Sequence, residues 1–366
     1  MYSSQCRPEA ANLLGAEGSA SQGTRGSDKR ETLLAGDGTE RAAGLEAAAR
    51  AIQQAESILI TTHINPDGDA IGSSLGLWHI ARAAGKTACV VNQDGAGTRY
   101  LFLPGAGGIE TDTQQVFDLG VAVDCGGIGR VGRVRDALER CKTVMRIDHH
   151  LAGEPFGDIE YLDPDAAAVG EMIVEIAHAL DLPVSAEAAA CLLASIVEDT
   201  GCFQFSRVSA LSLRICAELV AAGADLHSVV QQLYWRNPEG AARLRGACLT
   251  RMRTQCGGRL AWTAASTTDF DQFGATEEDA DEVVHDMLRI GTVEVAVLLR
   301  ESAKDYRVSL RSRDSVDVAS LAREFGGGGH ERAGGCRIGK GEADVAALIA
   351  AAAQRLEKPG NTPGVP

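Results

Sequence analysis

The sequence predicts an α/β protein, with a doubly wound, mainly parallel sheet in its first half and a smaller, mixed α/β domain in its second half. Four nearly continuous apolar runs indicate parallel strands, because strands buried on both faces lack alternation: "ILITT", "TACVVN", "DLGVAVDCG" and "TVMRIDHH". Apolar residues at helical spacing lie between and after these runs, as alternating strands and helices require. Shorter strands beyond residue 257 predict the second domain.

The predicted elements follow one another in a consistent order. A helical lead-in over 39–55 precedes a strand, a polar loop and a helix that ends at Gly85. After the remaining parallel strands, helices rich in Ala and Leu are predicted over 168–180, 186–199, 209–223 and 226–235. The second domain then carries strands over 259–266, 293–302 and 306–313, a helix over 316–325, a glycine-rich loop, and a last strand and helix.

The length of 366 residues is enough for two domains with their own cores. Small polar residues, Pro and Gly dominate both ends of the chain, where we predict disordered tails over 1–40 and 357–366. Between the tails we predict a first domain over 41–237, a linking helix over 238–256 and a second domain over 257–356.

The composition excludes several classes of protein. A net charge of -15 argues against a broad electrostatic grip on long nucleic acid, because affinity for a polyanion comes mainly from cations that neutralise phosphates. No apolar stretch is long enough to span a membrane. The ten cysteines are scattered singly, which is typical of reduced thiols in a cytoplasmic protein. A small anionic ligand in a local positive or metal-loaded pocket remains allowed.

Acidic and imidazole side chains follow three of the predicted parallel strands. The carboxyl ends of such strands meet at one edge of the sheet, where α/β proteins bind their ligands. A fourth contribution comes from the end of an apolar helix in "SIVEDTG". The residues that we expect to gather at this edge are His63, Asp67, Asp69, Asp124, Asp148, His149, His150 and Asp199.

Such a gathering of carboxylates is costly without cations, because like charges within several ångströms raise one another's pKa. Oxygen and imidazole ligands without thiolate suit Mn²⁺ or Mg²⁺. The ligands are too many for one ion. Two divalent metals bridged by one carboxylate, roughly 3.5–4 Å apart, would use them all and generate a hydroxide for in-line attack on phosphorus.

A rival interpretation comes from "GGIGRVG", which places Gly127, Gly129 and Gly132 at the spacing of a dinucleotide-binding loop. It lies after a strand and before a candidate helix over 133–141. The chain would then be an NAD-type dinucleotide-binding protein. This hypothesis leaves the acids and imidazoles without a role, and the same glycines serve equally well as a loop beside a metal site.

The second domain carries its own candidate ligand loop, "FGGGGHERAGG". Gly328 and Gly329 let backbone amides approach an anion closely, and His330 adds a side-chain donor. Upstream, Arg311 and Arg313 alternate along a strand and are expected to present guanidinium groups to phosphate or carboxylate, although a solvated strand face explains them equally well. We therefore predict a cleft between the two domains that closes over a phosphorylated substrate.

Taken together, these segments resemble the DHH phosphoesterases, in the branch of two-domain oligoribonucleases (nanoRNases) and pAp phosphatases. The resemblance spans about residues 45–355 and rests on five motifs in order: "HINPDGDAIGSSLGL", "VAVDCG", "DHH", "EDTGCF" and "GGGGHERAGG", the last typical of the DHH-associated C-terminal domain. Gly68 stands where the family often has Ala, and the long amino-terminal extension is not part of its pattern.

The resemblance also implies roles for individual residues. It assigns one metal to His63, Asp67 and Asp124. It assigns the second metal, with Asp124 as the bridge, to Asp69, Asp124, His149 and Asp199. It further implies that His150 lies beside the nucleophile or the scissile phosphate and that Asp148 supports the site by hydrogen bonds. His330 and the glycine loop would grip the substrate phosphate, with help from Arg311 and Arg313.

The function implied by the resemblance is hydrolysis with two Mn²⁺ ions, for which Mg²⁺ or Co²⁺ can substitute. Expected substrates are RNA fragments of two to five nucleotides, cut to nucleoside monophosphates, and 3′-phosphoadenosine 5′-phosphate (pAp), converted to AMP. The alternatives are a phosphodiesterase for cyclic di-AMP or linear dinucleotides, and an inorganic pyrophosphatase. A homodimer is among the partners we expect, and a membrane is not.

Overall fold

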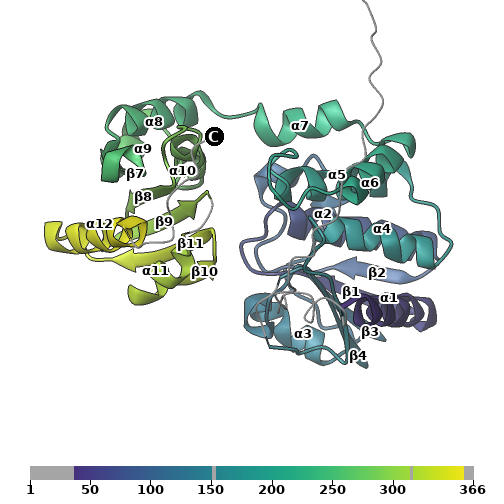
Figure 1. Cartoon of the computed structure of the whole chain (residues 1–366). Helices are drawn as coiled ribbons and strands as arrows, with labels where there is room; N and C mark the ends of the chain where they lie inside the picture. Colours follow the sequence, from purple (N-terminus) through teal and green to yellow (C-terminus); the bar gives the residue numbers. More distant parts are fainter. Residues whose placement is uncertain (1–36, 151–153, 314–315, 358–366) are drawn as a thin grey trace, which may run out of the picture. The chain divides into compact units, whose positions relative to one another are not determined.

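The computed structural model describes residues 37–150, 154–313 and 316–357. Most of the two predicted tails therefore lies outside the described residues, and the first four residues of α1 (Asp37–Gln54) overlap the end of the first predicted tail. The chain divides into two compact units, one ending at Ala224 and the other starting at Asp225 (Figure 1). Among the described residues, no helix combines the length and apolar character needed to cross a bilayer.

The first unit is built on a parallel sheet of five strands in the order β2-β1-β3-β4-β5, which confirms the doubly wound prediction. The strands are β1 (Ser57–Thr61), β2 (Thr87–Val90), β3 (Leu119–Val123), β4 (Thr143–Asp148) and β5 (Ile159–Leu162). The sequence analysis missed β5, because this edge strand has four residues of which only one is buried, so it lacks a long apolar run.

Helices cover both faces of this sheet. On one face, α2 (Gly68–Ala83) and α4 (Val169–Ala179) pack against each other and against α5 (Ala186–Asp199), with α6 (Ala210–Ala221) beyond them (Figure 1). The helices α2 and α5 approach closely because Gly72 lacks a side chain. A Cβ atom there would lie 2.5 Å from the carbonyl oxygen of Cys191.

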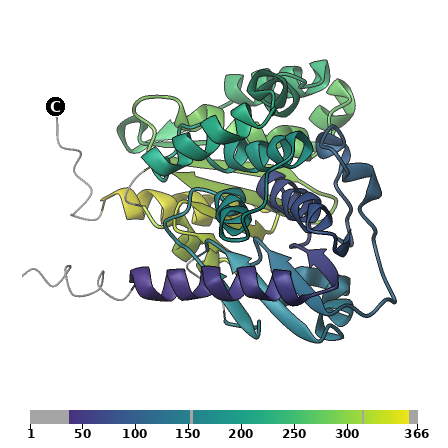
Figure 2. The same ribbon diagram turned by 90° about the vertical axis from the view of Figure 1, so that its right-hand side faces the viewer.

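A short helix covers part of the opposite face of the sheet, and α1 covers one edge. On the opposite face, Leu59 and Ala122 pack with Leu138 of α3 (Arg135–Glu139). At the edge, α1 packs against β5 and α4, and it is the long purple helix of Figure 2. Thus the predicted helix over 133–141 is reduced to the five residues of α3, preceded by the 3₁₀ segment η3 (Ile128–Val134).

The second unit contains a mixed sheet of six strands in the order β10-β11-β9-β8-β7-β6, where only β7 and β8 run parallel. Its strands are β6 (Arg253–Gln255), β7 (Leu260–Ala265), β8 (Val295–Glu301), β9 (Tyr306–Ser312), β10 (Gly328–His330) and β11 (Ala333–Ile338). The predicted glycine loop thus includes β10, which pairs with β11 as a hairpin. This confirms a mixed α/β second half.

Helices lie on both faces of the second sheet as well. One core joins the sheet to α11 (Val318–Glu324) and α12 (Glu342–Glu357), with Val297, Leu321 and Leu348 at its centre. The other core joins it to α8 (Glu239–Thr250) and α10 (Asp281–Leu288). Among the described residues, this unit also has the α-helices α7 (Leu226–Tyr234) and α9 (Thr267–Phe273), of which the sequence predicted only the first.

Candidate metal centre

The predicted acids and imidazoles lie at the carboxyl edge of the first sheet. In the strand order 2-1-3-4-5 the connections diverge between β1 and β3, which is the point where such sheets bind ligands. His63 lies two residues beyond β1, Asp124 directly follows β3 and His149 directly follows β4. The topology alone therefore brings together residues that are far apart in the chain.

One group at this edge consists of His63, Asp67 and Asp124, whose ligand atoms all lie within 4.8 Å of one another. The Nε2 atom of His63 is 3.8 Å from Asp67 Oδ2 and 3.5 Å from Asp124 Oδ2. Its Nδ1 atom lies 2.8 Å from the carbonyl oxygen of Ile64 and is placed to donate to it. That tautomer leaves the Nε2 lone pair facing the two carboxylates, as a metal-binding histidine requires.

A second group consists of Asp69, His149 and Asp199, again with ligand atoms within 4.8 Å of one another. His149 Nε2 is 3.8 Å from Asp69 Oδ2 and 3.6 Å from Asp199 Oδ2. His149 Nδ1 lies 3.1 Å from the carbonyl oxygen of Ala166, so this ring is oriented in the same way as that of His63. The side chain of Asp69 is fixed by the hydroxyl of Ser195 at 2.5 Å and by backbone amides at the start of α4.

Asp124 lies between the two groups. Its Oδ1 atom is 3.8 Å from His149 Nε2 and 3.4 Å from His150 Nδ1, while its Oδ2 atom faces His63. The backbone of Asp124 adopts a left-handed conformation with φ 50°, a strain that is typically stored at functional sites. Its Oδ1 atom is buried without a hydrogen-bond partner. A bound cation would satisfy that oxygen.

The electrostatics of the site also favour a cation. Burial, together with the charge of Asp199, raises the pKa of Asp69 to about 7. Burial likewise raises the pKa of Asp199 to about 7, and that of Asp124 lies well above its ordinary value. Divalent ions would stabilise the ionised carboxylates, and these oxygen and imidazole donors are those that Mn²⁺ and Mg²⁺ prefer. The residues present therefore fit a two-metal centre.

His150 is oriented by a buried relay. Its Nδ1 atom donates to Asp148 Oδ1 at 2.7 Å, and Asp148 Oδ2 accepts from Arg146 Nη2 at 2.5 Å. Both Arg146 and Asp148 are fully buried, and their partners hold the pKa of Asp148 at about 2 despite its desolvation. Asp148 therefore stays ionised and fixes the tautomer of His150, and its supporting role in the site remains a prediction.

Gly68 begins α2 between the two acids Asp67 and Asp69, and the structure explains why glycine occupies this position. A Cβ atom at Gly68 would lie 1.9 Å from Glu198 Oε2. The carboxylate of Glu198 fills that space and is held by the hydroxyl of Tyr100 at 2.8 Å. The departure from the alanine often found in the family is thus matched by a glutamate on α5.

We expect Gly68→Ala to weaken metal binding and to cost about 1–3 kcal/mol of stability, the usual effect of overpacking a filled site. The new methyl group would push the start of α2, and with it Asp67 and Asp69, away from α5. Isothermal titration with Mn²⁺ and thermal unfolding measure the two effects. Gly246→Ala on α8 is the control, because a Cβ atom there meets open space. If Gly68→Ala/Glu198→Ala binds Mn²⁺ no better than the single variant, this explanation is wrong.

The predicted substrate residues lie in the second unit, and their roles remain predictions. Arg311 is partly buried on β9, which lowers its pKa, and donates to the carbonyl oxygen of Leu310 at 3.0 Å. Arg313 follows β9, and its guanidinium group donates to backbone carbonyl oxygens at the end of α10. Gly328 and Gly329 belong to β10, where Gly329 has φ 136° and a Cβ atom would lie 2.2 Å from the carbonyl oxygen of Ala333. The backbone of His330 pairs with Ala333.

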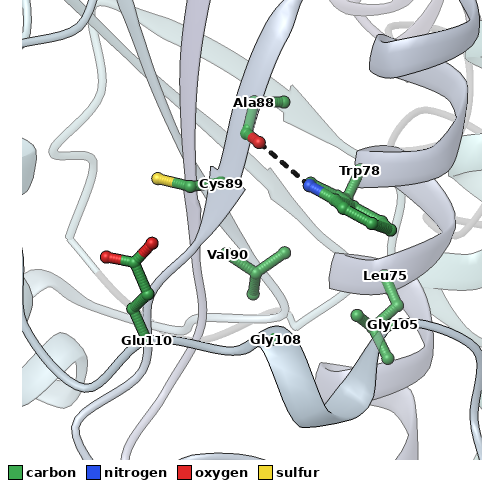
Figure 3. Close-up of a pocket in the computed structure, with 8 residues that line it drawn as sticks. All are labelled: Leu75, Trp78, Ala88, Cys89, Val90, Gly105, Gly108 and Glu110. Atoms are coloured by element: carbon green, nitrogen blue, oxygen red, sulfur yellow. Dashed lines mark hydrogen bonds between the residues drawn. The ribbon is translucent and has the colours of Figure 1, made fainter.

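Two hollows in the first unit lie away from the predicted ligands. One, of about 160 Å³, lies between α2 and β2, where Trp78 Nε1 donates to the carbonyl oxygen of Ala88 (Figure 3). The other, of about 490 Å³, includes Gly132 and three arginines.

The "GGIGRVG" segment forms a 3₁₀ turn before a helix of only five residues. It therefore lacks the long helix whose amino terminus would receive a dinucleotide pyrophosphate.

Sequence reasoning gave no role to three residues that the structure brings to the site. Ser195 holds Asp69, Arg146 holds Asp148, and Arg207 Nη1 lies 3.3 Å from His149 Nδ1. Arg146 lies in "RIDHH", where a charged residue inside a buried strand was a visible anomaly. Nothing in the local pattern distinguishes Ser195 or Arg207, because their roles depend on tertiary packing.

Comparison with known proteins supports the resemblance. Residues 57–196 match the model of the DHH family, N-terminal domain, and residues 257–358 match the DHHA1 domain. The chain is 34% identical over 284 residues to the bifunctional oligoribonuclease and PAP phosphatase of Thermus thermophilus, covering 77% of this chain and 84% of that protein. It is 25% identical to the cyclic-di-AMP phosphodiesterase of Listeria monocytogenes, covering 76% of this chain but only 44% of that longer protein.

A solved structure agrees with these matches. The exopolyphosphatase-related protein of Bacteroides fragilis superimposes with a TM-score of 0.80 at 25% identity, covering 86% of this chain and 96% of that one. The matches thus cover both the first and the second half of the chain. The chain therefore belongs to the DHH family of phosphoesterases, with an amino-terminal DHH domain and a carboxyl-terminal DHHA1 domain.

Proposed function

We propose that this protein is a Mn²⁺-dependent phosphoesterase that hydrolyses RNA fragments of two to five nucleotides to nucleoside monophosphates and converts pAp to AMP. The observation that carries the proposal is the pair of ligand groups on either side of Asp124, whose buried Oδ1 atom has no hydrogen-bond partner. The similarity to the Thermus enzyme supports the choice of substrates.

The proposed ligands for one ion are His63, Asp67 and Asp124. Those for the other are Asp69, Asp124, His149 and Asp199. Divalent ions bound there would polarise the phosphoester and lower the pKa of the attacking water. The protein contributes orientation, because the Nδ1 atoms of His63 and His149 face backbone carbonyls and their Nε2 atoms face the carboxylates.

His150 is proposed to act on the substrate side of the centre. Burial lowers its pKa, but the hydrogen bond to Asp148 and the charge of that carboxylate outweigh this effect and raise it. When it is protonated, an imidazole held in this way carries a hydrogen on Nε2 as well and can donate it to a phosphate oxygen. Arg311, Arg313, Gly328, Gly329 and His330 are proposed to bind the substrate from the DHHA1 domain. A cytoplasmic location and a homodimer remain predictions.

The second candidate function is hydrolysis of cyclic di-AMP or of its linear product. The similarity to the Listeria phosphodiesterase favours it, and the same metal centre would act on either phosphodiester linkage. Pyrophosphate is a third candidate substrate. No observation on the described residues of the second unit favours it. All three hypotheses need the metal centre, so they differ in substrate preference alone.

A side-by-side rate comparison tests the proposal. With the full chain and Mn²⁺, we expect a dinucleotide and pAp to be hydrolysed faster than cyclic di-AMP or pyrophosphate, and excess EDTA to abolish every activity. Release of mononucleotides is measured by chromatography. Faster turnover of cyclic di-AMP would favour the second candidate function over the first. Saturable NAD binding with no hydrolysis would contradict the phosphoesterase assignment for this chain.

A further inference from the structure

The segment between α5 and α6 is held in one conformation beside the proposed metal centre. Gly201, Cys202 and Phe203 adopt left-handed φ angles of 56°, 57° and 66° in succession. Thr200 holds this turn by accepting at its hydroxyl from the amide of Phe203 and at its carbonyl from the amide of Phe205. The ring of Phe205 packs over Gly201, where a Cβ atom would lie 2.6 Å from it. These contacts set the point from which the residues after the turn extend.

Arg207 follows the turn, and its guanidinium group lies against the imidazole of His149, with Nη1 3.3 Å from Nδ1. The same Nδ1 atom lies 3.1 Å from the carbonyl oxygen of Ala166. If Nδ1 carries the proton and donates to Ala166, it has no lone pair to accept from Arg207. A neutral His149 that ligates through Nε2 must have that tautomer. The ligand state of His149 thus leaves the Arg207 donors available.

Within the part of the chain that the structure describes, no salt bridge joins Arg207 to an acid, and the residue is exposed. Its charge acts on Asp199, where it opposes the rise in the pKa of that carboxyl caused by burial. The proposed metal ligands include four carboxylates, whose four negative charges two divalent ions neutralise: Asp67, Asp69, Asp124 and Asp199. The loaded centre would then keep the positive charge of Arg207 facing an incoming anion.

We propose that Arg207 binds a phosphate oxygen of the nucleotide substrate on the side of the centre formed by Asp69, His149 and Asp199. A guanidinium fork matches the geometry of phosphate and stays charged at every working pH. This inference rests on the proposed function and adds to it a substrate-binding residue supplied by the first unit. Arg207 is thus distinct from the predicted anion loop of the DHHA1 domain.

The experiment compares Arg207→Gln, Arg207→Lys and the control Arg214→Gln, which removes one exposed positive charge from α6. We expect Arg207→Gln to raise KM for a dinucleotide, and the dissociation constant of AMP in the presence of Mn²⁺, by about tenfold, the loss typical of a hydrogen bond to a charged group. Arg207→Lys should recover part of the affinity. The affinity for Mn²⁺ alone, measured by titration calorimetry, should change less than about twofold in every variant.

The outcomes separate this inference from the proposed function. If the wild type binds no Mn²⁺ and hydrolyses none of the substrates, the proposed function fails first. If the wild type is active and Arg207→Gln binds AMP as tightly as it does, Arg207 does not contact the phosphate. A loss of Mn²⁺ affinity in Arg207→Gln would instead make it a positioning residue for His149, which overturns the inference equally.

Discussion

Replacing Asp124 by Asn is expected to abolish Mn²⁺-dependent hydrolysis. The carboxylate lies between the two ligand groups and is the member that both proposed metals share. Its loss should lower the rate by well over about 100-fold, since even an outer-shell partner of a metal site is worth 10–100-fold. Single-turnover hydrolysis of a dinucleotide and titration with Mn²⁺ measure the two losses.

The same variant should be at least as stable as the wild type when EDTA is present. Asp124 is 3% exposed, and burial together with the charges of neighbouring acids raises its pKa, so a neutral amide removes an unfavourable charge from the metal-free protein. Thermal unfolding in EDTA tests this point and shows that the lost activity is not lost folding. Asp271→Asn, at an exposed position in the second unit, is the matched control. An active, Mn²⁺-binding Asp124→Asn would refute the bridging role.

Replacing Arg146 by Met is expected to destabilise the first unit severely. Arg146 and Asp148 are 2% and 0% exposed, and removing one partner of a buried ion pair typically costs about 3–5 kcal/mol. Asp148 would stay buried without its guanidinium partner and with the imidazole of His150 still bonded to it. For a unit of this size the cost corresponds to a fall of roughly 6–20 °C in Tm. Differential scanning calorimetry in the absence of metal measures it.

The double variant Arg146→Met/Asp148→Asn is the control for that experiment. Removing both charges should recover much of the stability, because no buried carboxylate then lacks its guanidinium partner at this position. It should not recover activity, since His150 loses the carboxylate that orients it. Equal instability of the single and double variants would mean that the packing of the Arg146 side chain, and not its charge, supports the sheet.

Strand ends were predictable from the sequence because apolar runs and the polar residues after them are local signals. The runs before His63, Asp124 and His149 predicted both the parallel strands and the edge at which these residues meet. The strand order and the left-handed backbone of Asp124 were not accessible in this way. Both depend on packing across the sheet.

Short or half-exposed elements escaped the sequence analysis for a related reason. The strand β5 has one buried residue in four and the three residues of β6 are all exposed, so neither strand has an apolar run. At the site, Arg207 is missed because its contact with His149 spans 58 positions in the chain. The match of Gly68 to Glu198 is likewise a tertiary relation between two helices.

The proposed ligands come from separate segments of the first unit, the earliest at His63 and the latest at Asp199. An ion can be fully coordinated only after the sheet has formed and α5 has docked on α2. The ion would bind weakly to the folding transition state and tightly to the native state. Its binding would therefore chiefly slow unfolding. Bound manganese would then raise the kinetic stability of the DHH domain. Resistance to proteolysis would increase by more than the change in melting temperature indicates.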